Sequence, residues 1–147
     1  MTSDLRALYR EVIVDHSKHP RNFRTLEAGR RSEGRNPLCG DRLTVYVQVD
    51  NGAIQDVSFE GMGCAIAIAS ASLMTESVKG KTLAEAQALF EQFQQLITAS
   101  AEAPVNLGDL SAFAGVRKFP VRVKCATLPW QALRAAASGR VEVVSTE

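Results

Sequence analysis

The chain has 147 residues, which is the size of about one ordinary domain. Apolar residues make up 46% of it and charged residues 22%, a globular composition that excludes a disordered chain and a disulfide-dense mini-protein. Seventeen basic and 16 acidic residues leave a net charge of +1, which excludes the strong positive field that dominates nucleic-acid binding. We therefore expect a single domain over residues 1–147, with no nucleic acid as its partner.

The first third of the chain predicts one helix and two strands. Apolar residues recur at helical spacing over about 4–17 and stop before Pro20, which predicts an amphipathic helix. A polar, arginine-rich stretch over 20–42 follows. Apolar and polar residues then alternate over 43–49, which predicts a strand with one buried face, and the next strand covers 53–60.

Two turns could join these strands. A two-residue turn at Asn51-Gly52 would place Val57 on the face opposite Val45, whereas a three-residue loop over 50–52 pairs Val45 with Val57. Because the apolar residues of both strands should share one buried face, we expect the three-residue loop, with Gly52 at positive φ.

Small and apolar residues over 65–78 predict a second helix, which Gly80 closes in a position suited to a left-handed C-cap. Thr82 and Glu85 form a capping box. A third helix is therefore expected to start at once.

The last third of the chain predicts a connection that contains Pro104, over about 99–109, and then further helical segments. These cover about 110–118 and 120–138, and Pro129 marks a break or a new first turn. The order of elements lacks a strand–helix–strand alternation. It therefore indicates an α+β fold, with a small antiparallel β-sheet of two to three strands packed against about five helices.

The three cysteines are an odd number, so a closed disulfide framework cannot use all of them. The chain begins without the apolar region of a signal peptide, and no segment approaches the roughly 18 apolar residues of a membrane span. We therefore expect a cytoplasmic protein without a membrane partner.

Each cysteine lies where an element is expected to begin or end. Cys39 is in a Pro/Gly turn before a strand, Cys64 follows a glycine pair at a helix start, and Cys125 lies near a proline-marked break. At a helix start, unpaired N–H groups favour the thiolate, which is the form that binds metals. A single cysteine is as easily a small buried hydrophobic residue. Three in such positions favour a metal site.

A three-thiolate site needs a fourth ligand for tetrahedral zinc. Asp41 is the nearer candidate, because Cys39 and Asp41 flank a flexible glycine; the alternative is a turn carboxylate that caps its own loop. Nearby cations would balance the thiolate charge, and the segment 117–124 carries four, including Arg122 three residues before Cys125. The alternative is a solvated basic helix face.

Several phrases of the sequence resemble one known family. They are Leu8-Tyr9-Arg10-Glu11-Val12-Ile13-Val14-Asp15-His16, Pro20-Arg21-Asn22, Asn36-Pro37-Leu38-Cys39-Gly40-Asp41, Gly61-Met62-Gly63-Cys64-Ala65-Ile66, Ala69-Ser70-Ala71-Ser72 and Val78-Lys79-Gly80-Lys81-Thr82. They look like the IscU/NifU-N family of iron–sulfur assembly proteins, over about residues 5–138. Within the family the chain is most similar to the zinc-containing SufU branch. IscU proteins carry a histidine directly before the third cysteine, where this chain has Lys124, and the gap between the second and third cysteines is lengthened as in SufU.

The resemblance implies an IscU/SufU-like fold and a zinc ion held by Cys39, Asp41, Cys64 and Cys125. It implies that Cys39 accepts persulfide sulfur from a SufS-type cysteine desulfurase, after a desulfurase histidine has replaced Cys39 on the zinc. We expect Arg122 to pair with the freed or persulfidated Cys39. The protein would then be a stoichiometric carrier and desulfurase activator rather than an independent enzyme, passing sulfur to a downstream iron–sulfur scaffold.

Two other functions remain open at this point. The first is a scaffold on which a transient iron–sulfur cluster is built on Cys39, Cys64 and Cys125, since thiolate sites also suit such clusters. The loss of the IscU-type histidine at Lys124 weighs against it. The second is an adaptor module in which zinc is only structural; a domain of this size should fold without a metal, which weighs against that function.

Overall fold

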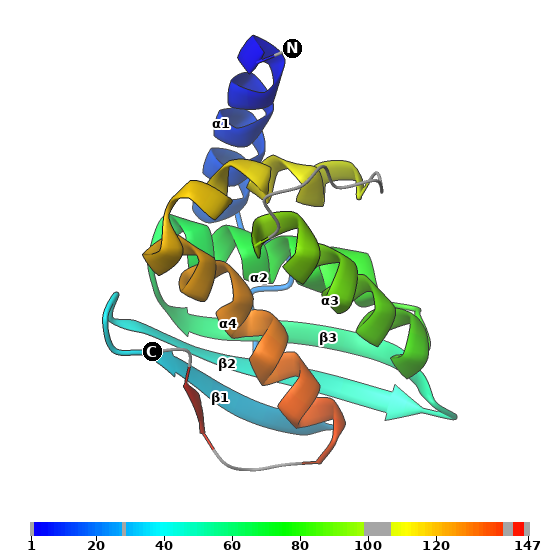
Figure 1. Cartoon of the computed structure of the whole chain (residues 1–147). Helices are drawn as coiled ribbons and strands as arrows, with labels where there is room; N and C mark the ends of the chain where they lie inside the picture. Colours follow the sequence, from blue (N-terminus) through cyan, green and yellow to red (C-terminus); the bar gives the residue numbers. More distant parts are fainter. Residues whose placement is uncertain (1, 28, 99–106, 140–142, 146–147) are drawn as a thin grey trace.

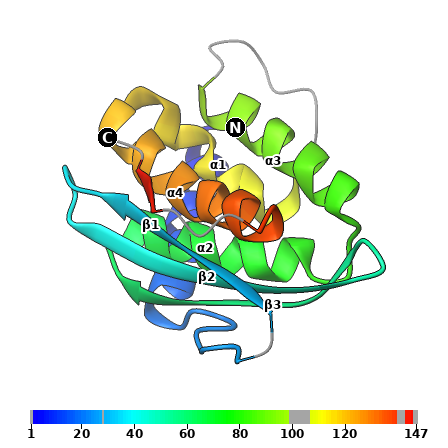
Figure 2. The same cartoon turned by 90° about the horizontal axis from the view of Figure 1, so that it is seen from below.

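The structure, a computed structural model, describes all residues except 1, 28, 99–106, 140–142 and 146–147. In chain order the elements are α1 (Thr2–Lys18), β1 (Arg30–Asn36), β2 (Asp41–Asp50), β3 (Ala53–Met62), α2 (Ala65–Val78), α3 (Leu83–Thr98), the 3-10 helix η1 (Gly108–Lys118), α4 (Pro120–Ala137) and β4 (Val144–Ser145). The helices pack on one face of the sheet, and α4 crosses this face in front of the strands in Figure 1; Figure 2 shows the molecule from below. The α+β class is confirmed.

The sheet is larger than predicted. It has four strands in the order β3-β2-β1-β4, and the short β4 pairs parallel to β1, so the sheet is mixed rather than purely antiparallel. Strand β1 lies inside the arginine-rich stretch, and its buried positions are Ser32, Gly34 and Asn36. Because these residues are small or polar, no apolar alternation marks the strand in the sequence.

The predicted pairing of the β2–β3 hairpin is wrong. The chain turns at Asn51-Gly52, which both have positive φ, 54° and 75°, as a type I′ turn requires. A β-bulge close to this turn shifts the register by one residue, so that Val45 pairs with Phe59 and not with Val57. Because of the bulge, Val57 and Phe59 both still face the core. Counting turn residues cannot reveal such a bulge.

The second and third helices begin and end as predicted. Helix α2 covers Ala65–Val78, and Gly80 has a φ of +87°. The capping box before α3 is formed in both directions: the Thr82 N–H donates to Glu85 Oε1 at 2.9 Å, and the Glu85 N–H donates to Thr82 Oγ1 at 3.1 Å. These bonds lower the pKa of Glu85.

Thr82→Ala should lower the free energy of unfolding by about 1 kcal/mol, because it leaves the Glu85 N–H without its acceptor. Urea unfolding measures the change. Thr82→Ser keeps the hydroxyl, so its free energy of unfolding should fall much less. Equal decreases in the two variants would contradict the capping role.

Helix α4 runs unbroken through Pro129, so the predicted break is absent. Proline cannot donate to the carbonyl four residues earlier, which here belongs to Cys125. Contacts from α2 hold this part of α4: Ser70 Oγ donates to the Ala126 carbonyl at 2.6 Å and accepts from Trp130 Nε1 at 3.1 Å. Tertiary packing therefore overrides the local signal at the proline. The predicted connection around Pro104 lies mainly outside the described residues.

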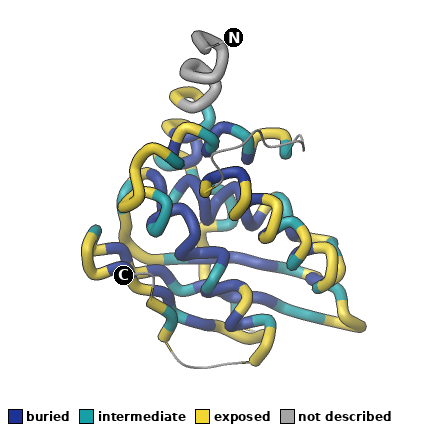
Figure 3. The backbone as a smooth tube through the Cα atoms, in the orientation of Figure 1, coloured by how far each residue is buried: buried dark blue, intermediate teal, exposed yellow. Residues whose placement is uncertain are grey.

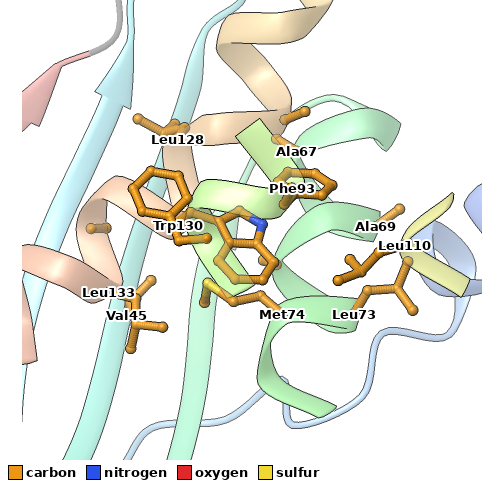
Figure 4. Packing of buried hydrophobic residues seen from close by; sticks show 14 of the residues in the cluster. Val45, Ala67, Ala69, Leu73, Met74, Phe93, Leu110, Leu128, Trp130 and Leu133 are labelled. Atoms are coloured by element: carbon orange, nitrogen blue, oxygen red, sulfur yellow. The ribbon is translucent and has the colours of Figure 1, made fainter. Parts of the chain in front are cut away.

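The core fills the space between the sheet and the helices. Buried segments are concentrated where the helices face the strands (Figure 3). Trp130 of α4 stacks on Phe93 and Phe90 of α3, with ring centroids 5.0 and 5.8 Å apart. Figure 4 shows this cluster with residues of α2, β2 and η1 around it. None of the described helices is long and apolar enough to span a bilayer.

A buried histidine joins α1 to α2. His16 is 4% exposed, and its Nδ1 lies 2.7 Å from Ser72 Oγ, which also accepts the N–H of Arg21. Burial, and after it the charge of Arg21, lowers the pKa of His16 from the ordinary value of 6.5. Folding therefore favours the neutral imidazole.

This burial predicts a pH dependence of stability. Below pH 6.5 the unfolded chain binds the His16 proton more readily than the folded protein, so the stability from neutral His16 is complete above pH 6.5 and is lost as the pH falls. One proton contributes at most about 1.4 kcal/mol per pH unit. Urea unfolding at pH 7.5 and 5.5 should show a smaller pH dependence in His16→Asn than in the parent. His19→Asn, an exposed control, should match the parent; an unchanged dependence in His16→Asn would contradict the assignment.

Candidate metal centre

Two connections and helix α4 carry the cysteines at one end of the molecule, so Cys125 lies inside an unbroken helix and not at the expected break. The loop 37–40 between β1 and β2 holds Cys39, and Asp41 begins β2. Cys64 is the N-cap residue of α2, and Cys125 lies near the start of α4. Figure 1 shows this loop and the starts of both helices on the same side of the fold. The β-hairpin and the two helices thus bring together residues that lie far apart in the sequence.

The four residues meet closely. Cys125 Sγ lies 2.9 Å from Cys39 Sγ, and these two sulfurs and a carboxylate oxygen of Asp41 all lie within 4.8 Å of one another. Cys64 Sγ lies 3.8 Å from Asp41 Oδ2, just outside this tighter group of three. Three sulfur donors and one carboxylate suit a four-coordinate zinc site, so these residues fit such an ion.

Asp41 is held by the start of α2. It is 2% exposed, and its Oδ1 accepts the backbone N–H of Cys64 at 2.8 Å. Gly63 leaves room for this contact, because a Cβ there would lie 3.1 Å from Asp41 Oδ1. The carboxylate therefore caps the start of α2 rather than its own loop, and its second oxygen faces the thiols.

The surroundings of two thiols push their pKa values apart. The pKa of Cys64 is lowered to about 7 by its hydrogen bond with Cys125 and by the backbone N–H groups of Ala67 and Ile66, the effect expected at a helix start. The same hydrogen bond and burial raise the pKa of Cys125. The surroundings therefore favour the thiolate form of Cys64 over that of Cys125.

Comparison with known proteins shows the family to which this chain belongs. Residues 8–137 match the family model described as the NifU-like N terminal domain. The chain belongs to the NifU-like N-terminal domain family. It is 42% identical over 132 residues to the zinc-dependent sulfurtransferase SufU of Bacillus subtilis, and the alignment covers 89% of this chain and 90% of that protein.

Other relatives of this NifU-like domain are described as scaffold proteins. The chain is 42% identical over 135 residues to the iron–sulfur cluster assembly scaffold protein IscU of Streptococcus pyogenes, covering 91% of this chain and 85% of that one. A crystal structure of the SufU protein of Fervidobacterium islandicum, described as a scaffold protein for the SUF system, superposes with a TM-score of 0.80 at 37% identity. That match covers 89% of this chain and 97% of the other. The fold is thus that of IscU/SufU-like proteins.

Among the described residues of this NifU-like domain, Arg122 has Phe119 as its contact. Its guanidinium lies 4.7 Å from the centroid of the Phe119 ring, and the described part of the chain shows no hydrogen bond between Arg122 and a site thiol. Arg117, another of the four cations, donates to the carbonyls of Ala114 and Leu96. Arg117 therefore joins η1 to α3, and the pairing of Arg122 with persulfidated Cys39 stays a prediction.

Asn36, the last residue of β1, is a site residue to which no sequence pattern assigned a role. The residue is fully buried, and its Nδ2 donates to Cys125 Sγ at 3.5 Å. Its Oδ1 accepts the N–H of Leu38, and its carbonyl accepts the N–H of Cys39, each at 3.2 Å. Its place just before the Pro-Leu-Cys turn was a signal for the loop contacts. The contact with Cys125 depends on how α4 packs, which the sequence does not show.

Proposed function

We propose that this protein is a zinc-binding sulfur carrier of iron–sulfur cluster assembly, which accepts persulfide sulfur on Cys39 from a SufS-type cysteine desulfurase. The convergence of Cys39, Asp41, Cys64 and Cys125 carries the proposal. The similarity to the zinc-dependent sulfurtransferase SufU supports it. The sulfur would pass to a downstream iron–sulfur scaffold, in the reducing cytoplasm where free thiols persist.

Cys39, Asp41, Cys64 and Cys125 would hold the zinc ion. When bound, zinc keeps its cysteine ligands deprotonated at neutral pH. Cys125 is buried, whereas Cys39 and Cys64 are both half-buried, and Leu38 beside Cys39 is 64% exposed. Burial therefore leaves Cys39 and Cys64 within reach of a partner protein, and the family resemblance favours Cys39 of the two as the acceptor.

The transfer step needs a thiolate and a persulfide. The Cys39 thiolate attacks the outer sulfur of the desulfurase persulfide, and a new S–S bond forms as the bond to the desulfurase cysteine breaks. The desulfurase cysteine leaves as a thiolate. Both electrons of the broken bond depart with it, so the step requires no external oxidant or reductant.

Exposed apolar side chains lie in the segments that carry the three cysteines. Leu38, Met62, Phe119 and Val121 are 64%, 77%, 48% and 50% exposed. Exposed apolar residues beside a reactive group are typical of a surface that a protein partner covers. The desulfurase would dock there.

A cluster scaffold is the second candidate function, because the IscU protein of Streptococcus pyogenes is as similar to this chain as SufU of Bacillus subtilis. Lys124 favours the carrier, since it stands where the family resemblance places a cluster-ligating histidine in IscU. Because lysine at this position replaces the histidine, the ligands left for the metal would be the three cysteines and Asp41.

Metal analysis of aerobically purified protein distinguishes the two functions. About one zinc per chain without visible absorbance is expected for the carrier, whereas brown protein with stoichiometric iron would favour the scaffold. Incubation with a SufS-type desulfurase and cysteine should then raise desulfurase turnover and add the mass of one sulfur atom on Cys39. No gain in either would contradict the acceptor role.

A further inference from the structure

The three sulfurs of the site differ in the groups that donate to them. Cys64 Sγ, at the N-cap of α2, lies 3.8 Å from Asp41 Oδ2 and makes no side-chain capping hydrogen bond. Cys125 Sγ accepts from the side-chain amide of Asn36 at 3.5 Å. In the described part of the chain, the only hydrogen bond to Cys39 Sγ comes from the Cys125 thiol. Once Cys125 is a thiolate, Cys39 has no described donor.

A hydrogen bond to a thiolate withdraws charge from the sulfur and weakens it as a nucleophile, and such outer contacts also fix a metal ligand in place. Cys125 is 1% exposed and Asn36 is fully buried, so water does not replace this contact. Of Cys125 and Cys39, the donor pattern therefore restrains the buried Cys125 sulfur and leaves the Cys39 sulfur on its exposed loop unrestrained.

The chemistry of the amide explains why asparagine stands at this position. Its NH₂ group donates to Cys125 Sγ, while its oxygen accepts the Leu38 N–H and so shapes the loop that carries Cys39. An aspartate could keep the loop contact, but as a carboxylate it offers no proton to sulfur. One neutral side chain thus connects the restrained thiol and the reactive loop.

We propose that Asn36 is a positioning residue that holds Cys125 as the persistent metal ligand and thereby leaves Cys39 as the thiolate that takes up sulfur. The inference rests on the proposed function, and it adds the reason why Cys39 rather than Cys125 reacts. Asn36 itself touches neither the sulfur donor nor the transferred sulfur.

The first test compares Asn36→Asp with the parent in the zinc-loaded protein. Iodoacetamide labelling, mapped by mass spectrometry, should modify Cys39 at least about tenfold faster than Cys125 in the parent. In Asn36→Asp, which keeps the acceptor for the Leu38 N–H, this ratio should fall at least threefold. Arg35→Ala, an exposed neighbour paired with Glu33, should leave the ratio unchanged. An unchanged ratio in Asn36→Asp would overturn the inference.

The second test needs no variant. In protein loaded with ¹¹³Cd, an N–H···S hydrogen bond to a metal-bound sulfur transmits a scalar coupling, so an Asn36 side-chain amide proton should couple to the cadmium. Absence of this coupling, in a sample where the cysteines coordinate cadmium, would overturn the inference. If the parent accepts sulfur on Cys39 while both tests fail, only the role of Asn36 is wrong; if the parent binds no zinc and accepts no sulfur, the proposed function itself fails.

Discussion

Cys39→Ser is expected to abolish sulfur acceptance and to leave the fold intact. A serine hydroxyl remains protonated at neutral pH, so it cannot attack a persulfide as a thiolate does. Cys39 is only half-buried on the loop 37–40, so the free energy of unfolding of the metal-free protein should change by no more than about 0.5 kcal/mol. Mass spectrometry after incubation with a desulfurase and cysteine should show at least a hundredfold less sulfur on the chain.

Cys64→Ser provides the matched control, because it removes a proposed zinc ligand and keeps the proposed acceptor. It should lose zinc affinity, and because zinc no longer holds Cys39 deprotonated, it should gain sulfur on Cys39 more slowly than the parent but not lose the gain. Sulfur found on Cys64 or Cys125 of the parent, or an undiminished gain in Cys39→Ser, would show that another thiol is the acceptor. Loss of zinc and loss of sulfur acceptance can thus be told apart.

The sequence predicted those elements whose signal is local. The limits of α2 follow from a continuous run of small and apolar residues, and the start of α3 follows from the capping box of Thr82 and Glu85. Strand β1 was missed because Ser32 and Asn36 occupy buried positions without apolar side chains. Pro129 was misread because its effect on α4 depends on contacts with α2, which no local pattern reports.

In the candidate site, too, the sequence indicated the residues with a local signal and missed the contacts that depend on long-range packing. Cys39, Cys64 and Asp41 could be singled out because they lie beside glycines at expected element boundaries. The structure brings Cys39, Asp41 and Cys125 together and places Cys64 beside Asp41. The amide of Asn36 could not be singled out, since its sulfur partner lies 89 residues further along the chain. The orientation of Arg122 was also beyond the sequence, because the ring of Phe119 competes for its guanidinium.

Two substitutions of Asp41, whose oxygens have different partners, should separate its effect on stability from its effect on zinc binding. Asp41→Ala leaves the buried N–H of Cys64 without its acceptor and should destabilise the metal-free protein by about 1–3 kcal/mol. Asp41→Asn keeps an oxygen for that N–H, so its free energy of unfolding should stay near that of the parent. Both variants lose the anionic oxygen beside the thiols, so zinc affinity should fall at least about tenfold in each.

Urea unfolding of the metal-free proteins and competition with a zinc chelator measure the two effects separately. Asp56→Asn is the matched control, since this carboxylate pairs with Arg24 and Lys79 away from the thiols and should change neither zinc affinity nor sulfur acceptance. Parent-like zinc affinity in Asp41→Asn would restrict Asp41 to capping α2 and leave the site with three thiolates and an open position. The expected pattern, in which only Asp41→Ala loses stability but both variants lose zinc, would show that one carboxylate anchors the helix that carries Cys64 and binds the metal.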